Sequence, residues 1–396
     1  MPKHIWIINE YAGSPYYGME FRHYYLAREL TKLGYKVTII SSSYSHLFKE
    51  FPKPGKENID GIDYLWLKTL NYGNAHSKKR VLKWFIFSFK LFELPFKLTK
   101  PDVIIVSPMA TTSVYPAWLL AKYYKAKFIF EVKDIWPQTL VEIGGYSHKH
   151  IFIKFLKKLE IFALKKSDLI ISNLINYQQY LVDNNINKQS YWISNGIDLD
   201  ELQQIEPLDD KIKTQIPNNK FIIGYTGTIG AANAIDTFLE AHKYIDNDNI
   251  IFVIVGDGQE KPKLINYYKN DKIIFIDSIP KKQIQSLLRL FDVCYIGWRN
   301  INIYKYGISA NKIFDYMYSG KPILHSYNGE NDLVKIANCG ITVPAEDPKA
   351  IARGIIELYN MSAESRNKLG NNGKNYVINN FSYQKLANEL VNIISK

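Results

Sequence analysis

Cysteine is scarce in this chain of 396 residues, which contains only Cys294 and Cys339. Two cysteines cannot build the disulfide framework of a small secreted protein, nor a zinc cage made of cysteine ligands. The chain has 8 histidines, and none of them stands in the H-E-x-x-H spacing of a zinc hydrolase. The composition therefore shows no sign of a metal site and fits the reducing cytoplasm.

Long uncharged runs are scarce as well, and the one stretch long enough to test as a membrane span runs from Val103 to Ala121. Pro108, Pro116 and a Thr-Thr-Ser run interrupt it, so a strand, a turn and a helix explain it better. We therefore expect no transmembrane helix and a cytoplasmic protein.

Positive charge is in excess, because 50 Lys and Arg residues face 38 Asp and Glu residues, a formal net charge of +12. Such a balance suits nucleic acid, an anionic membrane or a phosphate-bearing substrate. The charge is not gathered into an Arg-rich tail, and no nucleic-acid module is recognisable. We therefore expect no nucleic acid as a partner.

Short apolar runs alternate with helical patterns along the chain, which predicts βα units and parallel sheets. The alternation breaks between residues 198 and 220, where Asp, Gln, Pro and Asn are frequent. We predict an α/β protein of two Rossmann-like, doubly wound domains that face each other across a cleft. They cover residues 1–197 and 220–381, joined by a linker 198–219, and a final helix 382–396 packs back on the first domain. The predicted strands are 4–9, 36–41, 64–67, 103–107, 127–132, 169–172, 191–194, 221–225, 250–255, 272–276, 293–296, 322–325 and 341–343.

Glycine-rich turns follow the first strand of each domain. In the first, Gly13 and Gly18 precede a helix and could bring backbone amides close to a phosphate, or simply form a turn. The dinucleotide pattern G-x-G-x-x-G is absent, which counts against a nicotinamide or flavin enzyme. In the second, Gly227 and Thr228 offer amides and a hydroxyl after a strand, and a further tight turn follows at 256–258. Two such turns in one domain favour nucleotide binding.

The most specific segment is Tyr306-Gly-Ile-Ser-Ala-Asn-Lys-Ile-Phe-Asp-Tyr-Met-Tyr-Ser-Gly-Lys-Pro322. A helix over 311–319 places Lys312 near its N-terminus, where the helix dipole and the lysine charge both favour phosphate. Asp315 follows one turn later and could accept hydrogen bonds from ribose hydroxyls.

This segment, together with 224–230 and Glu131-Val-Lys-Asp-Ile-Trp-Pro137, resembles glycosyltransferase family 4 over nearly the whole chain. Within the family the chain is most similar to the branch that adds amino sugars, such as N-acetylfucosamine, to bacterial O-antigen and capsule units. The resemblance implies a GT-B fold, a UDP-sugar donor, retention at the anomeric carbon, and no metal or other cofactor. It also implies an undecaprenyl-diphosphate-linked saccharide as the acceptor.

The family's acidic pair falls on Gly307 and Asp315, so only the ribose contact transfers to this chain. Many members clamp the diphosphate with Arg and Lys after the first strand of the second domain, where this chain has Thr228 and Ala231. The resemblance then leaves the positive charge to Lys312 and Arg299. It implies these donor-binding residues: Gly18, Arg22, Gly227, Thr228, Arg299, Ser309, Asn311, Lys312 and Asp315.

A family His-Asp pair corresponds to Lys133 and Asp134, which we predict to be catalytic together with Lys312. Lys133 is either a cation near the donor or a surface lysine. Asp134 orients Lys133 or a sugar hydroxyl, or caps the following turn. The motif Asp198-Leu-Asp200 resembles a metal-binding D-x-D sequence, but it lies at the predicted linker and we set it aside.

A predicted helix from Arg80 to Leu98 carries Lys83, Lys90 and Lys97 at intervals of seven residues, beneath an aromatic face. A helix gathers such lysines on one stripe, which suits an anionic membrane. A second basic amphipathic segment covers 150–166. The alternative is that both are ordinary domain helices whose apolar faces pack inward.

We therefore predict a retaining glycosyltransferase on the inner face of the cell membrane, acting on a lipid-linked saccharide of a surface polysaccharide. A nucleotide-sugar epimerase of similar fold is one alternative. A non-catalytic nucleotide-sugar-binding protein is the other, because the first acid of the family pair is missing.

Overall fold

The computed structural model describes residues 4–18, 20–48, 50–73, 77–109 and 111–396, and the chain folds into two compact units. The first unit, unit 1, comprises Met1–Asn195, Tyr306–Ser309 and Tyr383–Lys396. The second, unit 2, comprises Gly196–Lys305 and Ala310–Ser382. The segment 198–219, which we expected to be a linker, therefore lies within unit 2.

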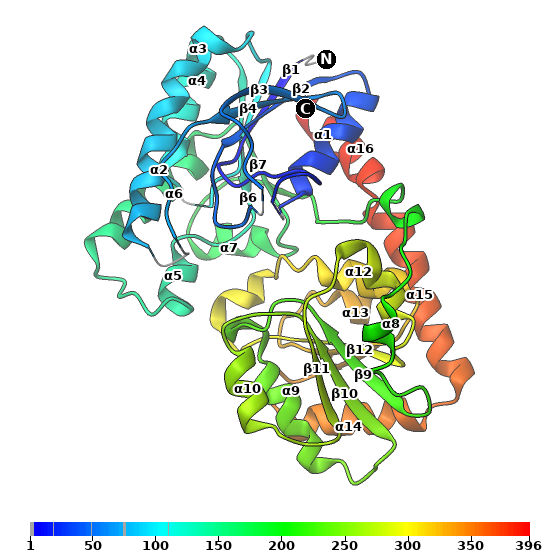
Figure 1. Ribbon diagram of the computed structural model, residues 1–396. Coiled ribbons are helices and arrows are strands. Elements are labelled where there is room, and N and C mark those ends of the chain that lie inside the picture. Colours follow the sequence, from blue (N-terminus) through cyan, green and yellow to red (C-terminus); the bar gives the residue numbers. More distant parts are fainter. Residues whose placement is uncertain (1–3, 19, 49, 74–76, 110) are drawn as a thin grey trace. The chain divides into compact units, whose positions relative to one another are not determined.

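Among its described residues, unit 1 contains an eight-stranded sheet of order β3-β4-β2-β1-β5-β6-β7-β8 (Figure 1). All neighbours pair in parallel except β3 and β4, which form a hairpin. The sequence did not predict β3, because its residues are mostly polar and exposed. The strands are β1 His4–Ile8, β2 Lys36–Ser42, β3 Gly55–Ile59, β4 Ile62–Leu67, β5 Val103–Val106, β6 Lys127–Val132, β7 Leu169–Ser172 and β8 Ser190–Trp192.

Helices cover both faces of this sheet. On one face α1 (Arg22–Lys32) packs against α16 (Tyr383–Ile394), where the rings of Tyr25 and Tyr383 stack at 4.8 Å. On the other face α2 (Lys78–Lys90), α3 (Leu94–Lys97), α4 (Val114–Tyr124) and α6 (Ile151–Lys166) lie together (Figure 1). Two short helices, α5 (Gln138–Glu142) and α7 (Tyr177–Asp183), follow β6 and β7.

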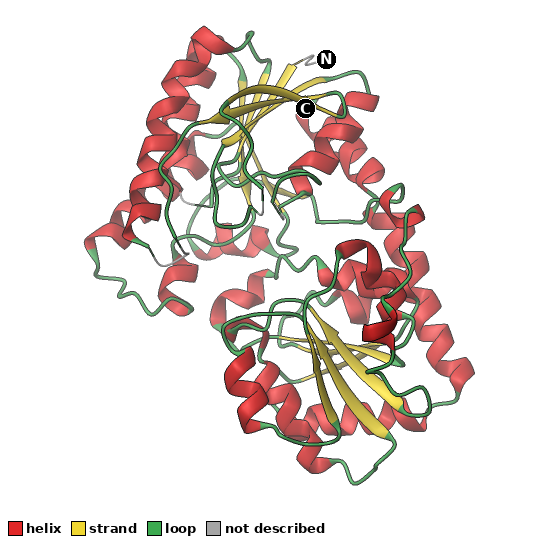
Figure 2. Cartoon of the chain, viewed as in Figure 1, coloured by secondary structure: helices red, strands yellow, loops and turns green. Residues whose placement is uncertain are grey.

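Unit 2 contains, in its described residues, a six-stranded parallel sheet of order β11-β10-β9-β12-β13-β14. Yellow strands between red helices make this layering visible in Figure 2. The strands are β9 Phe221–Thr226, β10 Ile250–Val255, β11 Ile273–Ile276, β12 Val293–Gly297, β13 Ile323–Ser326 and β14 Gly340–Val343. The helices are α8 Asp210–Lys213, α9 Ile235–Glu240, α10 Lys261–Tyr267, α11 Ile284–Leu288, α12 Lys312–Ser319, α13 Leu333–Ile336, α14 Pro348–Asn360 and α15 Ala363–Phe381.

Each unit is thus a Rossmann-like α/β layer structure with its own apolar core, as the sequence predicted. The parallel strands of a sheet all end at one edge of that sheet. In unit 1 the loops after β1 and β6 therefore lie at the same edge of its own sheet, and in unit 2 the loops after β9, β10 and β12 lie at the same edge of its sheet. In the described ranges, no helix has the length and apolar character needed to cross a lipid bilayer.

Candidate functional site

The turns after β9 and β10 touch through their glycine backbones. Gly227 (φ +127°) and Gly256 (φ +146°) both adopt conformations that side chains disfavour, and a Cβ on Gly256 would stand 1.9 Å from the Gly227 oxygen. The Gly227 amide donates to Val255 O (2.9 Å), and the Ile229 amide donates to Asp257 O (2.8 Å). Between these bonded positions, the amide of Thr228 has no partner among the described residues. The turn therefore has an amide available for an anion.

Lys312 begins α12 and reaches this turn. A hydrogen bond from the Thr226 amide to the Tyr316 hydroxyl (2.7 Å) ties α12 to the end of β9. One turn earlier, the Lys312 ammonium donates to the Tyr225 hydroxyl (2.5 Å) and to Asn233 Oδ1 (3.2 Å). A Cβ built on Gly227 would lie 3.0 Å from Lys312 Nζ, so a glycine leaves room for the ammonium.

The electrostatic state of Lys312 is unusual for a lysine. No carboxylate pairs with it within the described residues, and its ammonium lies 4.1 Å from the centre of the Tyr225 ring. Burial lowers the pKa of Lys312 to about 7. An anion bound at this turn would supply the missing counter-charge and raise that pKa.

Two further residues that we predicted to bind the donor, Thr228 and Asn311, also belong to unit 2. Thr228 is exposed, and its carbonyl oxygen accepts from the Tyr225 hydroxyl (2.6 Å) and from Asn233 Nδ2 (3.0 Å). Asn311 is the exposed N-cap of α12, and its side chain makes no capping bond there. Asn233, which we did not predict, holds both the turn and Lys312. The sequence gives no signal for it beyond its place after the turn.

Asp315 lies in the first turn of α12, as predicted. Gln285 donates to its backbone oxygen (3.0 Å), which fixes the helix at this point. Burial raises the pKa of the Asp315 carboxyl to about 6, and Lys281 opposes this shift. The carboxylate remains without a hydrogen-bond partner among the described residues, which suits a group that receives ligand hydroxyls.

Arg299, predicted as a cation for the diphosphate, already has carboxylate partners in unit 2. Its guanidinium pairs with Asp236 (2.8 Å) and Glu346 (3.0 Å), and its Nε donates to Ala231 O (2.8 Å). Two carboxylates already balance its single charge. Of the two predicted cations, Lys312 is the one without a carboxylate partner among the described residues.

Ser309 and Gly307 belong to unit 1 rather than to the unit that carries Lys312. Ser309 Oγ accepts from Asn173 Nδ2 (2.6 Å) and Asn195 Nδ2 (3.1 Å), and its predicted contact with the donor stays a prediction. Gly307 has φ +109°, and a Cβ there would lie 2.8 Å from the Ile175 amide nitrogen. This close approach explains why the first acid of the family pair has no counterpart in this backbone.

Lys133 and Asp134 follow β6 in unit 1. Lys133 Nζ pairs with Glu20 Oε2 (3.1 Å), and both side chains are largely covered. Asp134 is exposed, and its backbone oxygen accepts from the Trp136 amide (3.0 Å). The carboxylate that positions Lys133 is thus Glu20 and not Asp134. Sequence reasoning missed Glu20, because it stands 113 positions away.

Arg22, predicted to contact the donor, is held by buried contacts within unit 1. Its guanidinium, 3% exposed, donates to Glu131 Oε1 from Nε (3.1 Å) and Nη2 (3.0 Å) and also bonds Ile193 O, Ser194 O and Asn195 Oδ1. These contacts use all five N–H groups of an arginine.

Gly18 is likewise explained by packing, since a Cβ there would lie 2.6 Å from the Phe48 ring. The amides of Gly13 and Ser14 in the same loop are bonded to Glu20 O (3.0 Å) and Tyr17 O (2.7 Å). These two amides of the loop after β1 already have backbone partners and are not open to a phosphate.

The predicted lysine stripe is wrong at Lys83. This side chain is fully buried in unit 1, with its ammonium 4.2 Å from the centre of the Tyr11 ring, and burial lowers its pKa to about 8. Lys90 and Lys97 remain accessible and both pair with Glu93. Of the aromatic face, Trp84 and Phe87 are buried, whereas Phe85, Phe89 and Phe92 are exposed.

No group of three His, Cys, Asp or Glu side chains that could hold a metal ion occurs in the described parts of the chain. Asp198 accepts from the Glu201 amide (2.8 Å) and shapes a turn in unit 2. The absence of a cofactor remains a prediction from the family resemblance.

Comparison with known proteins gives consistent matches for both halves. Residues 16–201 match glycosyltransferase family 4, and residues 208–376 match glycosyl transferases group 1. An uncharacterized glycosyltransferase of Methanocaldococcus jannaschii is 26% identical over 330 residues, which cover 78% of this chain and 80% of that protein. The probable glycosyltransferase WbjE of Pseudomonas aeruginosa is 22% identical over 386 residues, 91% of this chain and 90% of that protein.

Among solved structures, HepE of Anabaena in complex with UDP-glucose is similar over 99% of each chain, with a TM-score of 0.70 and 12% identity. At this identity the likeness concerns the fold, which in both proteins consists of two Rossmann-like units, the architecture called GT-B. The chain is therefore a glycosyltransferase with the GT-B fold, whose first half matches family 4 and whose second half matches group 1.

Proposed function

We propose that the protein transfers a sugar from a UDP-sugar, bound by unit 2, to a saccharide acceptor, with retention at the anomeric carbon. The observation that carries the donor side is Lys312, a half-buried lysine without a carboxylate partner among the described residues, beside the open turn at Thr228. HepE, whose fold is similar, is known in complex with UDP-glucose. In this proposal the Asp315 carboxylate accepts hydrogen bonds from the ribose hydroxyls.

The chemistry requires stabilisation of a departing diphosphate. The bond between the anomeric carbon and the diphosphate oxygen breaks, and the acceptor hydroxyl oxygen bonds to that carbon from the same face. The hydroxyl proton passes to the leaving diphosphate oxygen. Lys312, the N-terminus of α12 and the Thr228 amide would supply positive potential where negative charge accumulates. No metal is needed for this step.

For the acceptor we propose a lipid-diphosphate-linked saccharide of a bacterial surface polysaccharide, reached at the cytoplasmic face of the cell membrane. An exposed apolar surface on α2, the 3-10 turn Leu91–Glu93, α3 and α6 of unit 1 supports membrane contact; we call it the helical apolar surface. The rings of Phe85 and Phe155 join its helices at 6.1 Å. It comprises Leu82 (53% exposed), Phe85 (41%), Phe89 (74%), Phe92 (44%), Phe96 (91%), Ile151 (82%) and Phe155 (41%).

The amino sugar of the donor, an N-acetylated deoxyhexosamine, is proposed from the resemblance to the O-antigen and capsule branch. A panel of UDP-sugars with a lipid-diphosphate saccharide tests it, with product followed on the lipid and its anomeric configuration read by NMR. Inversion at the anomeric carbon would refute retention. Isomerised nucleotide sugar without lipid product would indicate the epimerase, and binding without turnover would indicate a sugar-binding protein.

A further inference from the structure

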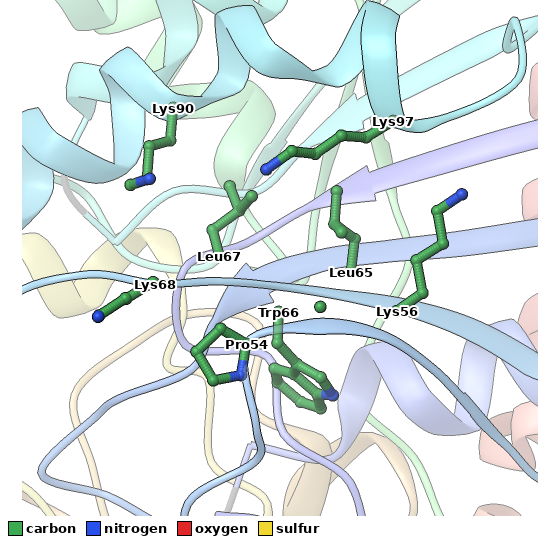
Figure 3. A pocket seen from close by; sticks show the side chains of 9 residues that line it. Pro54, Lys56, Leu65, Trp66, Leu67, Lys68, Lys90 and Lys97 are labelled. Atoms are coloured by element: carbon green, nitrogen blue, oxygen red, sulfur yellow. The ribbon is translucent and has the colours of Figure 1, made fainter.

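A basic pocket of about 280 Å³ lies in unit 1 between the β3–β4 hairpin and the segment that contains α2 and α3 (Figure 3). We call it the lysine pocket. It is lined by Pro54, Gly55, Lys56, Leu65, Trp66, Leu67, Lys68, Lys90 and Lys97. The lysine pocket belongs to unit 1, whereas Lys312 and Asp315, which are proposed to bind the donor, belong to unit 2.

The hairpin register explains how this pocket forms. Lys56 pairs with Leu65 across the antiparallel ladder, so both side chains share one face of the hairpin. Leu67 follows on that face, whereas Trp66 points to the opposite side (Figure 3). There Trp66 packs edge-on against Tyr17 at 5.7 Å. The leucines thus form an apolar floor, and the helical segment above brings Lys90 and Lys97 toward it.

Charge distinguishes this pocket from its neighbour. All charged residues that line the lysine pocket are lysines, and no acid lines it among the described residues. The adjoining pocket of about 240 Å³ contains Glu57 and Asp63 as well as lysines. Glu93 pairs with Lys97 (2.6 Å) and Lys90 (3.3 Å) outside the lining. One carboxylate cannot balance four ammonium groups, so the pocket attracts an anion.

The size of the cavity limits which anion fits. Pockets for ligands of drug size hold about 300–1,000 Å³, so a cavity of about 280 Å³ suits a small group such as a phosphate ester and not a nucleotide sugar. The surroundings indicate where that phosphate comes from. Phe89 and Phe96 each precede a pocket lysine and are 74% and 91% exposed. Exposed aromatic rings beside lysines are typical of surfaces that enter the headgroup region of a membrane.

We infer that the lysine pocket binds the headgroup phosphate of an anionic phospholipid while the neighbouring phenylalanines insert into the interface. This inference rests on the membrane contact proposed above and makes it specific. The lipid phosphate adds negative charge beside Lys56 and Lys68, and beside Lys90 and Lys97, which share the single carboxylate of Glu93. A bound headgroup would then hold unit 1 at the membrane at a defined point on the β3–β4 hairpin.

The experiment uses the full chain and two double variants of equal charge change. Lys56→Gln/Lys68→Gln removes the two pocket lysines that lie outside the amphipathic helices, and both positions are exposed. Lys211→Gln/Lys213→Gln, on exposed α8 of unit 2, is the matched control. Binding is measured by co-sedimentation with phosphatidylcholine vesicles that contain or lack phosphatidylglycerol, and melting curves check the fold.

We expect the pocket variant to lose roughly tenfold or more in affinity for the anionic vesicles, because a lysine near such a surface contributes about 1 kcal/mol. The control should stay within about twofold. Equal losses of vesicle affinity in both variants would mean that positive charge anywhere on the protein attracts the membrane. That result would overturn the inference of a specific site at the lysine pocket. If the protein binds soluble glycerol phosphate as tightly as it binds anionic vesicles, the ligand of the lysine pocket is a water-soluble phosphate ester. That result would overturn the assignment of the pocket to a lipid headgroup.

Failure of the proposed function would be visible separately. Sugar transfer to a water-soluble acceptor analogue does not need the membrane, so the pocket variant should retain the wild-type rate. If the wild-type protein transfers no sugar at all while the vesicle results hold, the lysine pocket stands and the proposed reaction is wrong.

Discussion

The ammonium group of Lys312 lies 2.5 Å from the hydroxyl oxygen of Tyr225 and 4.1 Å from the centre of its ring. This contact places a positive charge against an aromatic face and a neutral hydroxyl, neither of which balances it fully. Burial accordingly lowers the pKa of Lys312 to about 7. An anionic ligand bound beside Lys312 would therefore favour its protonated form.

Replacement of Lys312 should reduce catalysis strongly. A charge-assisted contact contributes about 1.5–3 kcal/mol, so Lys312→Met should lower kcat/KM for transfer by roughly 10- to 150-fold. Steady-state kinetics with a UDP-sugar check this, and the melting temperature should change little. Lys335→Met, at an exposed position of α13 in unit 2, is the control and should be near wild type. Unchanged turnover in a folded Lys312→Met protein removes the lysine from the site.

Donor affinity should depend on pH with a maximum between about pH 6 and 7. The attraction between protonated Lys312 and the diphosphate is present below its pKa and is lost as the pH rises through about 7. The acceptor capacity of the Asp315 carboxylate is present above its pKa and is lost as the pH falls through about 6. Calorimetric titration with UDP-glucose measures this profile, since its diphosphate diester does not titrate in that range.

Lys312→Arg separates the two limbs of that profile. Arginine stays protonated throughout this range, so the alkaline decline should disappear while the acid decline remains. A variant that keeps both limbs would show that Lys312 does not titrate on donor binding.

Loss of the Asp315 carboxylate should weaken the contact with the ribose of the nucleotide and leave the contacts with the transferred sugar unchanged. Asp315→Ala should therefore lower the affinities for UDP and for UDP-glucose by a similar factor, roughly tenfold for one lost charged hydrogen bond. Glu364→Ala is the comparison, because Glu364 is an exposed acid of the same unit in the first turn of α15. Equal affinity of Asp315→Ala and wild type for UDP would contradict the ribose role.

Arg22 should matter for stability and not for donor binding. Arg22→Met leaves Glu131 buried without its main partner, which should cost roughly 3–5 kcal/mol. Burial opposes the charged form of Glu131, but Arg22 and His23 hold its pKa well below 4.5. Hydrogen exchange should rise in β1, β6 and β8, whereas UDP-glucose binding by the folded protein stays the same. Lys36→Met, an exposed ion-pair partner of Asp63, should leave exchange unchanged.

Local patterns were sufficient to predict the two α/β units and every parallel strand of the described chain, because burial on both faces leaves long apolar runs in the sequence. They also placed Gly227, Lys312 and Asp315 correctly after strands and at a helix start. They failed where the partner is distant in sequence. Glu131 neutralises Arg22 across 109 positions, and no local pattern reveals this.

Lys83 shows a second limit of sequence reasoning. Its spacing from Lys90 correctly predicts one helix face, since both lie in α2. The same face is covered by the rings of Tyr11 and Tyr72 at Lys83 and is accessible at Lys90. Helical periodicity gives the direction of a side chain but not what the rest of the chain places above it.

The helical apolar surface should support attachment to membranes. Phe89 and Phe96 are 74% and 91% exposed, so Phe89→Ser/Phe96→Ser removes little packing and should leave the melting temperature nearly unchanged. Burying one such side chain in an apolar phase is worth about 1.5–3 kcal/mol. Even half of that value for each ring predicts a loss of roughly tenfold or more in binding to anionic vesicles.

Flotation measures this loss, and Tyr267→Ser/Ile336→Ser on unit 2, whose side chains are 69% and 51% exposed, is the matched control. Transfer to a lipid-linked acceptor should slow in the phenylalanine variant, while transfer to a water-soluble analogue continues at the wild-type rate. This difference arises because membrane attachment concentrates the enzyme near its acceptor without altering Lys312 or Asp315. If both variants float like the wild type, the exposed phenylalanines of α2 and α3 serve another partner, and the membrane proposal fails.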